Sequence, residues 1–196
     1  KKNKSFDKST PGFDGLRKYL GQGLLSSNSD NWKLHRKIAQ PFFQPQKING
    51  YFNLFRRQAA EKIERSILAS KSQPVDLNLW MASVTLAVLG DTLLGYDIGK
   101  DAGELADSIN CIFATTAKRL YNPIQLPLLI PTKSNCLFTR SQRKIESVIY
   151  RLIDSHRNEK IKKLSYVSEL MDYQNDAGDR LKFKAIYDEI ITMIQA

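Results

Sequence analysis

Three side chains that donate hydrogen bonds, Trp32, His35 and Arg36, lie close together in the stretch Trp-Lys-Leu-His-Arg-Lys. On a helix, positions i and i+4 share one face, so Trp32 and Arg36 point their donors in the same direction. Neither side chain accepts a hydrogen bond, and a carboxylate matches the arginine fork best. The spacing predicts a helix beside a carboxylate or phosphate, although a packed tryptophan next to a solvated arginine fits the pair equally well.

A second cluster of charge lies between residues 133 and 163, where nine basic residues face three acidic ones in a chain of net charge +10. Such a run can form a surface for an anionic partner, but it is more often the solvated face of an amphipathic helix. The basic residues are Lys133, Arg140, Arg143, Lys144, Arg151, Arg157, Lys160, Lys162 and Lys163.

Few other residues suggest catalysis or metal binding. The two histidines, His35 and His156, are too far apart in sequence to suggest a metal site or a catalytic triad. Cys111 lies in an apolar run and Cys136 in an expected loop, and neither has the glycine-rich, basic surroundings of a thiolate ligand. Two cysteines make no disulfide framework, which favours an intracellular, reducing compartment.

The hydrophobic pattern predicts a mainly α-helical fold in one domain over residues 1–196. A glycine- and serine-rich loop over 19–29 precedes the helix with the tryptophan and arginine, for which Ser29 or Asp30 is the expected N-cap. Pro41 closes that helix. Further helices are predicted over 51–68, 77–94, 104–120, 137–160, 166–173 and from 183 onward.

Two apolar segments have a composition that predicts more than helix or loop. Residues 77–94 are apolar on almost every side, which predicts a central, buried helix. Residues 122–133 contain three prolines among apolar residues and cannot form a regular helix. The last apolar pattern runs to Ala196 without a cap, so we expect an internal piece of a longer protein.

The order of these features is itself informative. A Gly-Leu-Leu loop leads into Trp-x-x-His-Arg-Lys and Pro-x-Phe, and an amphipathic helix, an apolar helix, the proline-rich linker and a basic helix follow. From about Gly12 to Ala196 this order resembles the N-terminal half of a cytochrome P450. Trp32 and Arg36 match the family's C helix, whose tryptophan and arginine hold a haem propionate. Residues 188–196 are similar to the start of its I helix.

The resemblance implies an incomplete cytochrome P450 fold, from helix C to the start of helix I, and it implies roles for single residues. A loop over 15–25 would face the substrate. The cofactor-binding residues would be Trp32, His35, Arg36, Leu25 and Ala196. The substrate-binding residues would be Leu24, Leu120, Tyr121 and Met193.

The same resemblance implies a haem-thiolate monooxygenase with haem b, which oxidises a lipophilic organic substrate with dioxygen. Its electrons would come from a ferredoxin or flavin reductase, for which Lys33 and Lys37 are candidate contacts. Residues 122–133 would form a lid over the substrate channel that is able to touch a membrane surface. We expect a cytoplasmic location.

Two motifs of the family are missing from the sequence. There is no Phe-x-x-Gly-x-Arg-x-Cys-x-Gly, which carries the haem-ligating cysteine, and no Glu-x-x-Arg. Cys111 and Cys136 do not fit the role of axial ligand. We therefore expect a fragment without a catalytic residue or metal ligand of its own, inactive when alone.

Two other classes of function fit parts of the sequence. A basic helical module would bind nucleic acid or an anionic membrane through residues 140–163, with binding that weakens steeply as salt rises. A helical interaction domain without a ligand would leave Arg36 solvated, so that its replacement by alanine would cost about 0.5 kcal/mol or less.

Overall fold

A computed structural model describes residues 8–70, 74, 76–99, 101–121, 127–158 and 164–195. Within these residues the fold is helical, and the only extended pairing is an isolated antiparallel bridge between Gln174 and Arg180. The elements are α1 (Pro11–Leu20), α2 (Ser29–Ala39), the 3-10 turn η2 (Gln40–Phe43), α3 (Pro45–Ser70), α4 (Leu77–Leu89), the π turn η3 (Gly90–Leu94), α5 (Ala102–Tyr121), α6 (Lys133–Asn158), α7 (Tyr166–Asp172) and α8 (Phe183–Gln195).

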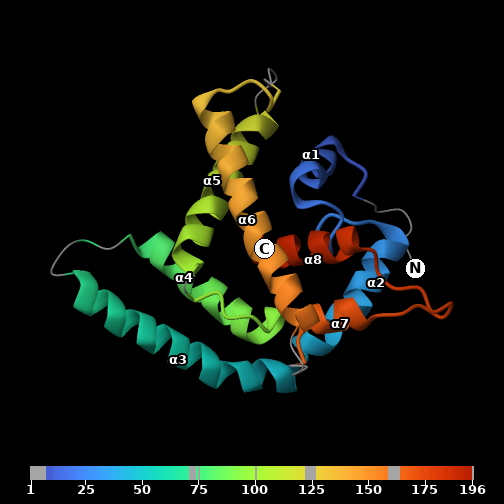
Figure 1. Ribbon diagram of the computed structural model, residues 1–196, viewed down its shortest axis with the longest axis horizontal. Helices are drawn as coiled ribbons and strands as arrows, with labels where there is room; N and C mark the ends of the chain where they lie inside the picture. Colours follow the sequence, from blue (N-terminus) through green and yellow to red (C-terminus); the bar gives the residue numbers. More distant parts are fainter. Residues whose placement is uncertain are drawn as a thin grey trace.

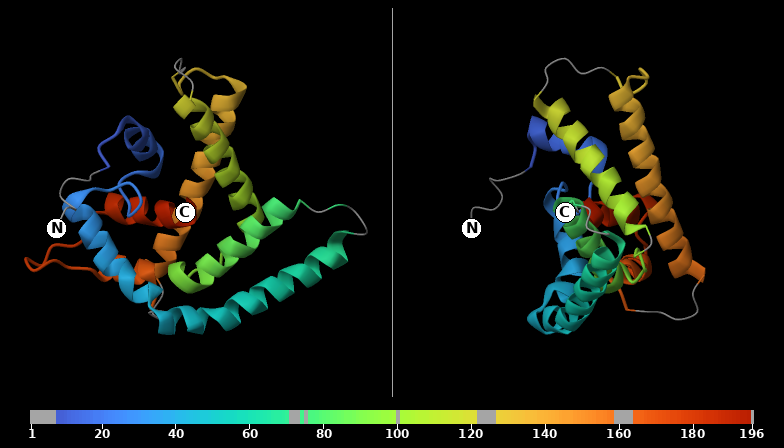
Figure 2. Two further views of the ribbon diagram at one scale, coloured as in Figure 1. Left: turned by 180° about the vertical axis from the view of Figure 1, so that it is seen from behind. Right: turned by 90° about the vertical axis from the view of Figure 1, so that its left-hand side faces the viewer.

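The helices α5 and α6 form a long antiparallel hairpin, and α4 packs against α5 at its base (Figure 1). The helix α8 crosses α6, with α2 and α7 on its far side, while α3 runs along one edge against α4 (Figure 2). The core lies where α5, α6, α7 and α8 meet. Its fully buried side chains include Leu105, Phe138, Ile149, Leu152, Tyr166, Leu170 and Ile190.

The proline-bounded helix with Trp32 and Arg36 is confirmed as α2. Pro41 lies in the 3-10 turn that follows, and Pro45 begins α3. The predicted N-cap was wrong by one residue, since the cap position belongs to Asn28 and its side chain does not cap the helix. That side chain instead accepts a hydrogen bond from the Lys8 backbone N–H at 2.8 Å, which ties α2 to the segment before α1.

The predicted loop over 15–25 was wrong for its first six residues, which belong to α1. Pro11 occupies the first turn, where its missing N–H has no cost, and the Thr10 side chain accepts a hydrogen bond from the Phe13 backbone N–H. Thr-Pro before a mixed apolar stretch is a helix start, and the glycines at 12 and 15 obscured it.

The helix over 77–94 is confirmed, as α4 followed by η3, but its predicted burial holds for one face only. Leu86, Ala87 and Leu94 are buried, whereas Leu77 and Met81 are exposed. The reason is that α3 and α5 pack against α4 from part of its circumference, and α7 contacts η3. Leu77–Leu94 is long and apolar enough to cross a membrane by length and composition alone, a test that a core helix of a soluble protein also passes.

The basic helix begins at Lys133, four residues before its predicted start, because Thr132 starts the first turn. The Thr132 carbonyl accepts from the Cys136 backbone N–H at 2.9 Å, and its hydroxyl accepts from the Asn135 N–H at 3.2 Å. Cys136 therefore lies in a helix and not in a loop. Of the proline-rich linker, residues 122–126 lie outside the described residues.

Candidate functional site

The face of α2 that carries Trp32 and Arg36 is open to solvent. The Arg36 guanidinium carbon lies 5.1 Å from the centre of the Trp32 ring, a cation–π contact that keeps the two donors together. Arg36 is exposed and Trp32 half-buried. Among the described residues no acidic side chain pairs with Arg36. Within the described residues, the pair is therefore a set of donors without an acidic partner, and the predicted anion beside it stays a prediction.

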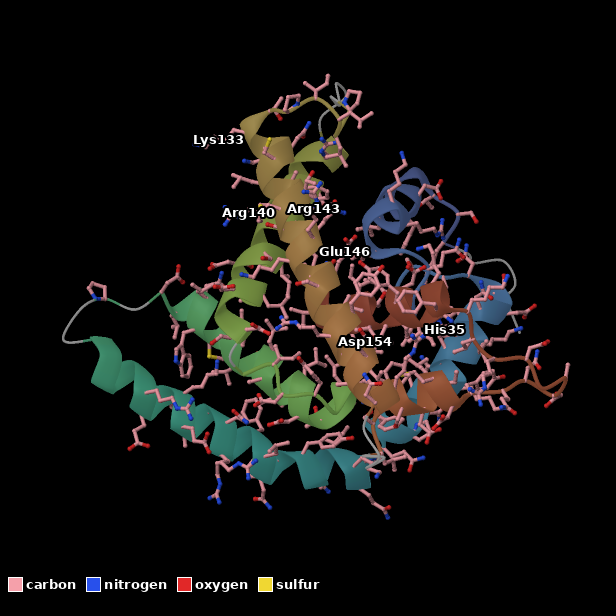
Figure 3. The ribbon with its side chains drawn as sticks, in the orientation of Figure 1. His35, Lys133, Arg140, Arg143, Glu146 and Asp154 are labelled. Atoms are coloured by element: carbon pink, nitrogen blue, oxygen red, sulfur yellow. The ribbon has the colours of Figure 1, made fainter. Side chains whose placement is uncertain are left out.

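His35 leaves α2 on a different face and is buried (Figure 3). Its Nδ1 lies 2.8 Å from Oε2 of Glu189, whose side chain is fully buried on α8. A buried carboxylate is costly unless it is paired or hydrogen-bonded. The neighbouring residues of α2 thus face two directions, with Arg36 toward solvent and His35 toward α8.

Two hydrogen-bond donors complete the surroundings of Glu189, whereas His35 Nδ1 lies close to Oε2 without the geometry of a hydrogen bond. The Tyr166 hydroxyl on α7 donates to Oε1 at 2.6 Å, and the Leu24 backbone N–H donates to Oε2 at 2.8 Å. Burial raises the pKa of the Tyr166 hydroxyl far above its usual range, and the negative charge of Glu189 raises it further. The phenol therefore stays protonated and keeps donating.

The adjacent carboxylate, Asp188, binds the same loop two residues before Leu24, at Gln22. Its Oδ2 accepts from the Gln22 backbone N–H at 2.9 Å, and its Oδ1 accepts from Lys184 at 2.7 Å. A Cβ on Gly21 would lie 2.1 Å from the Asp188 side chain, and a Cβ on Gly23 would lie 2.1 Å from Thr192 Oγ1. The glycines let the loop approach α8 closely enough for its N–H groups to reach both carboxylates.

Sequence reasoning missed Asp188 and Glu189 as polar anchors. They were assigned only to the start of an I-helix-like segment. Two adjacent acids in an otherwise apolar helix were the available signal, because buried carboxylates require partners. Their partners were not predictable, since Leu24 and Gln22 contribute backbone groups and no characteristic side chain.

The whole chain, residues 1–196, matches the family model described as Cytochrome P450. The chain belongs to the cytochrome P450 family. Cyclooctatin synthase of Streptomyces melanosporofaciens is 22% identical over 194 residues, which are 97% of this chain and 42% of that protein. Cytochrome P450 4V2 of Homo sapiens is 20% identical over 218 residues, covering 98% of this chain and 41% of the relative.

Ganoderic acid synthetase CYP5150L8 of Ganoderma lucidum is 31% identical over a shorter stretch of 106 residues, 53% of this chain and 19% of the relative. Where the match covers nearly all of this chain, it spans about two fifths of the relative's length. The relatives come from bacteria, fungi and animals.

Membership of the P450 family implies a haem cofactor. Haem carries carboxylates, so its cradle needs charged donors that have no carboxylate partner of their own. Arg36 meets this condition, and the half-buried Trp32 beside it adds an N–H donor. The donor set on α2 therefore fits a haem propionate.

The structure separates the other predicted P450 site residues. Leu24 is half-buried and packs on the core, while the neighbouring Leu25 is 45% exposed. Met193 lies on α8 and lines an open apolar groove of about 420 Å³ with Phe43, Leu86 and Leu89. Thus α8 contacts loop 21–28, which joins α1 to α2, through residues 188, 189 and 192, and it lines the groove with its last turn.

Three predicted residues cannot be assessed at side-chain level. Leu120 and Tyr121 form the last turn of α5, and only their backbone is described. Ala196 lies outside the described residues. Their contacts with substrate and cofactor stay predictions.

Proposed function

We propose that the whole protein is a haem-thiolate monooxygenase that oxidises a lipophilic organic substrate, using dioxygen and electrons from a redox partner. One observation carries the proposal. In a chain that matches the P450 family over its full length, Trp32 and Arg36 share the open face of α2 and have no acidic partner among the described residues. Bound haem would supply the oxygen activation.

The residues of this chain would hold the cofactor and shape the site. Arg36 would donate to a propionate and neutralise it, and the Trp32 N–H would donate beside it. Leu25, exposed in the described chain, would pack against the haem edge. Leu24 and Met193 would meet the substrate. Leu120, Tyr121 and Ala196 are assigned to the same site by resemblance to the family.

The axial thiolate would come from outside residues 1–196. Cys111 is half-buried in α5, and Cys136 is exposed in the first turn of α6. Both lie on the hairpin and not on α2. Residues 1–196 expressed alone would therefore lack monooxygenase activity. The electron donor, a ferredoxin or flavin reductase, would dock beside α2, where Lys37 is exposed and Lys33 is paired with Asp30 at 2.8 Å.

Arg36→Ala tests the assignment in the haem-bound full-length protein. Loss of a charge-assisted contact with a propionate is expected to speed haem release at least about tenfold, since such hydrogen bonds contribute roughly 1.5–3 kcal/mol. Transfer of haem to excess apomyoglobin, followed at the Soret band, measures the rate. Lys33→Ala, one residue after Trp32 and already paired with Asp30, is the matched control and should release haem at the wild-type rate. Equal rates for Arg36→Ala and wild type would contradict the proposal.

A membrane contact is favoured by a separate observation on the hairpin. Lys133, Arg140 and Arg143 lie along the same half of α6 (Figure 3). They have no ion pair among the described residues, whereas Lys144 pairs with Glu104 and Arg151 with Asp101. Three basic residues without an ion pair thus gather in the half of α6 nearest the proline-rich linker, while Arg157 at the far end lies over the Phe183 ring. Leu129 in that linker is 94% exposed, and Leu128 and Ile130 are also exposed. We propose that this end rests on an anionic membrane surface while the enzyme is otherwise cytoplasmic.

Vesicle binding separates this contact from the nucleic-acid alternative. The double variant Arg140→Glu/Arg143→Glu should bind phosphatidylserine vesicles at least about tenfold more weakly, because each basic residue near an anionic surface contributes about 1 kcal/mol. Leu129→Asp should weaken binding too, whereas nucleic acid would not need this leucine. Arg56→Glu on the exposed surface of α3 should have no effect. Binding to phosphatidylcholine alone with equal affinity would exclude the charged contact.

A further inference from the structure

We propose that Glu189 is a positioning residue, which fixes the haem-binding helix α2 and the substrate-facing loop 21–28 to one point on α8. The proposal rests on the function proposed above. It gives His35 an indirect part in haem binding, through the placement of its neighbour Arg36.

A single oxygen of Glu189 serves both elements. Oε2 lies 2.8 Å from His35 Nδ1 and accepts the Leu24 N–H at 2.8 Å. The other oxygen, Oε1, accepts the Tyr166 hydroxyl at 2.6 Å, which holds the carboxylate from the side of α7. The side chain is fully buried, so water does not compete for these contacts.

Loop 21–28 is also tied to Lys8 and Arg17, which lie before and on α1. Toward α8, the described residues give the loop one other hydrogen bond, from the Gln22 N–H to Asp188, and give α2 no other polar contact, so Glu189 transmits position between α8 and both elements. On α2, His35 and Arg36 are consecutive, so a shift of the imidazole moves the guanidinium with the same turn of helix. In the loop, Leu24 is the residue that donates to Glu189, and its side chain is one of those proposed to meet substrate. The carboxylate thus sets the distance between the propionate donors and the loop.

Asp188 provides an internal comparison. It accepts the Gln22 N–H and pairs with Lys184, so it holds the same loop, but no hydrogen bond or ion pair joins it to α2 among the described residues. His35 is the converse case, because its contact with Glu189 involves α2 and not the loop backbone. Of the two carboxylates, only Glu189 contacts both α2 and the loop. Substitutions at the three positions therefore separate the effect on the position of α2 from the effect on the position of loop 21–28.

The experiment uses the haem-bound full-length protein with Glu189→Gln, Asp188→Asn and His35→Asn. Haem release to apomyoglobin reports on α2, and binding of the azole miconazole, followed as a Soret shift, reports on the substrate side. Glutamine keeps the volume of Glu189 but turns an NH2 group toward one of the donors. Glu189→Gln should change both readouts about fivefold, as expected for the loss of one buried hydrogen bond. Asp188→Asn should change azole affinity only, and His35→Asn haem release only.

A stability control distinguishes positioning from general loosening. Leu170 lies on α7 and is fully buried, so Leu170→Ala creates a cavity in the hydrophobic core and lowers the melting temperature. It should leave both readouts within about twofold of wild type. If Glu189→Gln does not fold, the opposite selectivity of Asp188→Asn and His35→Asn decides the question.

Three results would overturn the proposal. The first is a Glu189→Gln variant with both readouts at wild-type values. The second is a set of variants, Leu170→Ala included, whose readouts all follow the melting temperature. The third is a wild-type protein without a Soret band, which would reject the proposed function as well, whereas the first two reject the role of Glu189 alone.

Discussion

Replacing Gly23 with alanine is expected to lower the free energy of unfolding by about 3 kcal/mol, the upper end of the usual range for overpacking. The new Cβ would lie 2.1 Å from Thr192 Oγ1 and 2.4 Å from the Asp188 carbonyl oxygen. The carbonyl belongs to the backbone of α8 and already accepts the Thr192 hydroxyl at 2.7 Å, so it has little room to move. The loop would have to retreat and would stretch the Leu24 hydrogen bond to Glu189.

Gly50→Ala is the matched control, measured by the same denaturant titration of the full-length protein. Gly50 lies inside α3, and a Cβ there meets no atom within 4 Å. Alanine is the better helix former, so this variant should be more stable by about 0.5–1 kcal/mol. Similar effects at the two glycines would show that loop 21–28 does not approach α8 as closely as described.

Tyr166→Phe should lower the free energy of unfolding by about 2 kcal/mol at pH 7, because a buried carboxylate oxygen of Glu189 loses its donor. The deficit should shrink at alkaline pH. The pKa of Tyr166 is raised in the folded protein, so above pH 10 the unfolded chain releases a proton that the folded chain keeps. Wild type then loses about 1.4 kcal/mol of stability per pH unit through this residue, and the phenylalanine variant does not.

Denaturant titrations at neutral pH and above pH 10 measure the difference between the two proteins. Tyr187 also has a raised pKa, mainly through burial and then through Glu146, and it contributes the same slope to both. Tyr150→Phe, at a half-exposed position on α6, is the control and should change stability by no more than about 0.5 kcal/mol at either pH. A Tyr166→Phe deficit that stays constant up to pH 11 would contradict the assignment.

Features of this chain that depend on neighbouring residues were predictable from the sequence. The helical positions of Trp32 and Arg36, their shared face and the prolines after them are local properties, and the structure confirms them. The segments that became α5, α6 and α8 were found for the same reason, since a period of 3.6 is visible in one stretch of sequence. The P450 family itself was recognised from the order of such local features.

Features that depend on distant residues were not predictable. His35 was assigned to haem with its neighbours, because nothing near it in sequence marks Glu189 as the carboxylate it faces. The burial of 77–94 was overestimated, since composition does not tell which faces other helices cover. The start of α1 was missed because its cap and proline were weighed less than its glycines. The direct contacts of the predicted site residues with haem and substrate stay predictions.

The tie between Leu24 and Glu189 also has a consequence for synthesis on the ribosome. The two residues are 165 positions apart, so the loop emerges long before its acceptor exists. At 5–20 residues per second the interval is on the order of ten to thirty seconds. The hairpin of α5 and α6 needs only sequence-near contacts and can form within that time. Until then, the backbone N–H groups of the nascent loop donate to water. The loop can pack against α8 only after α8 has been synthesised.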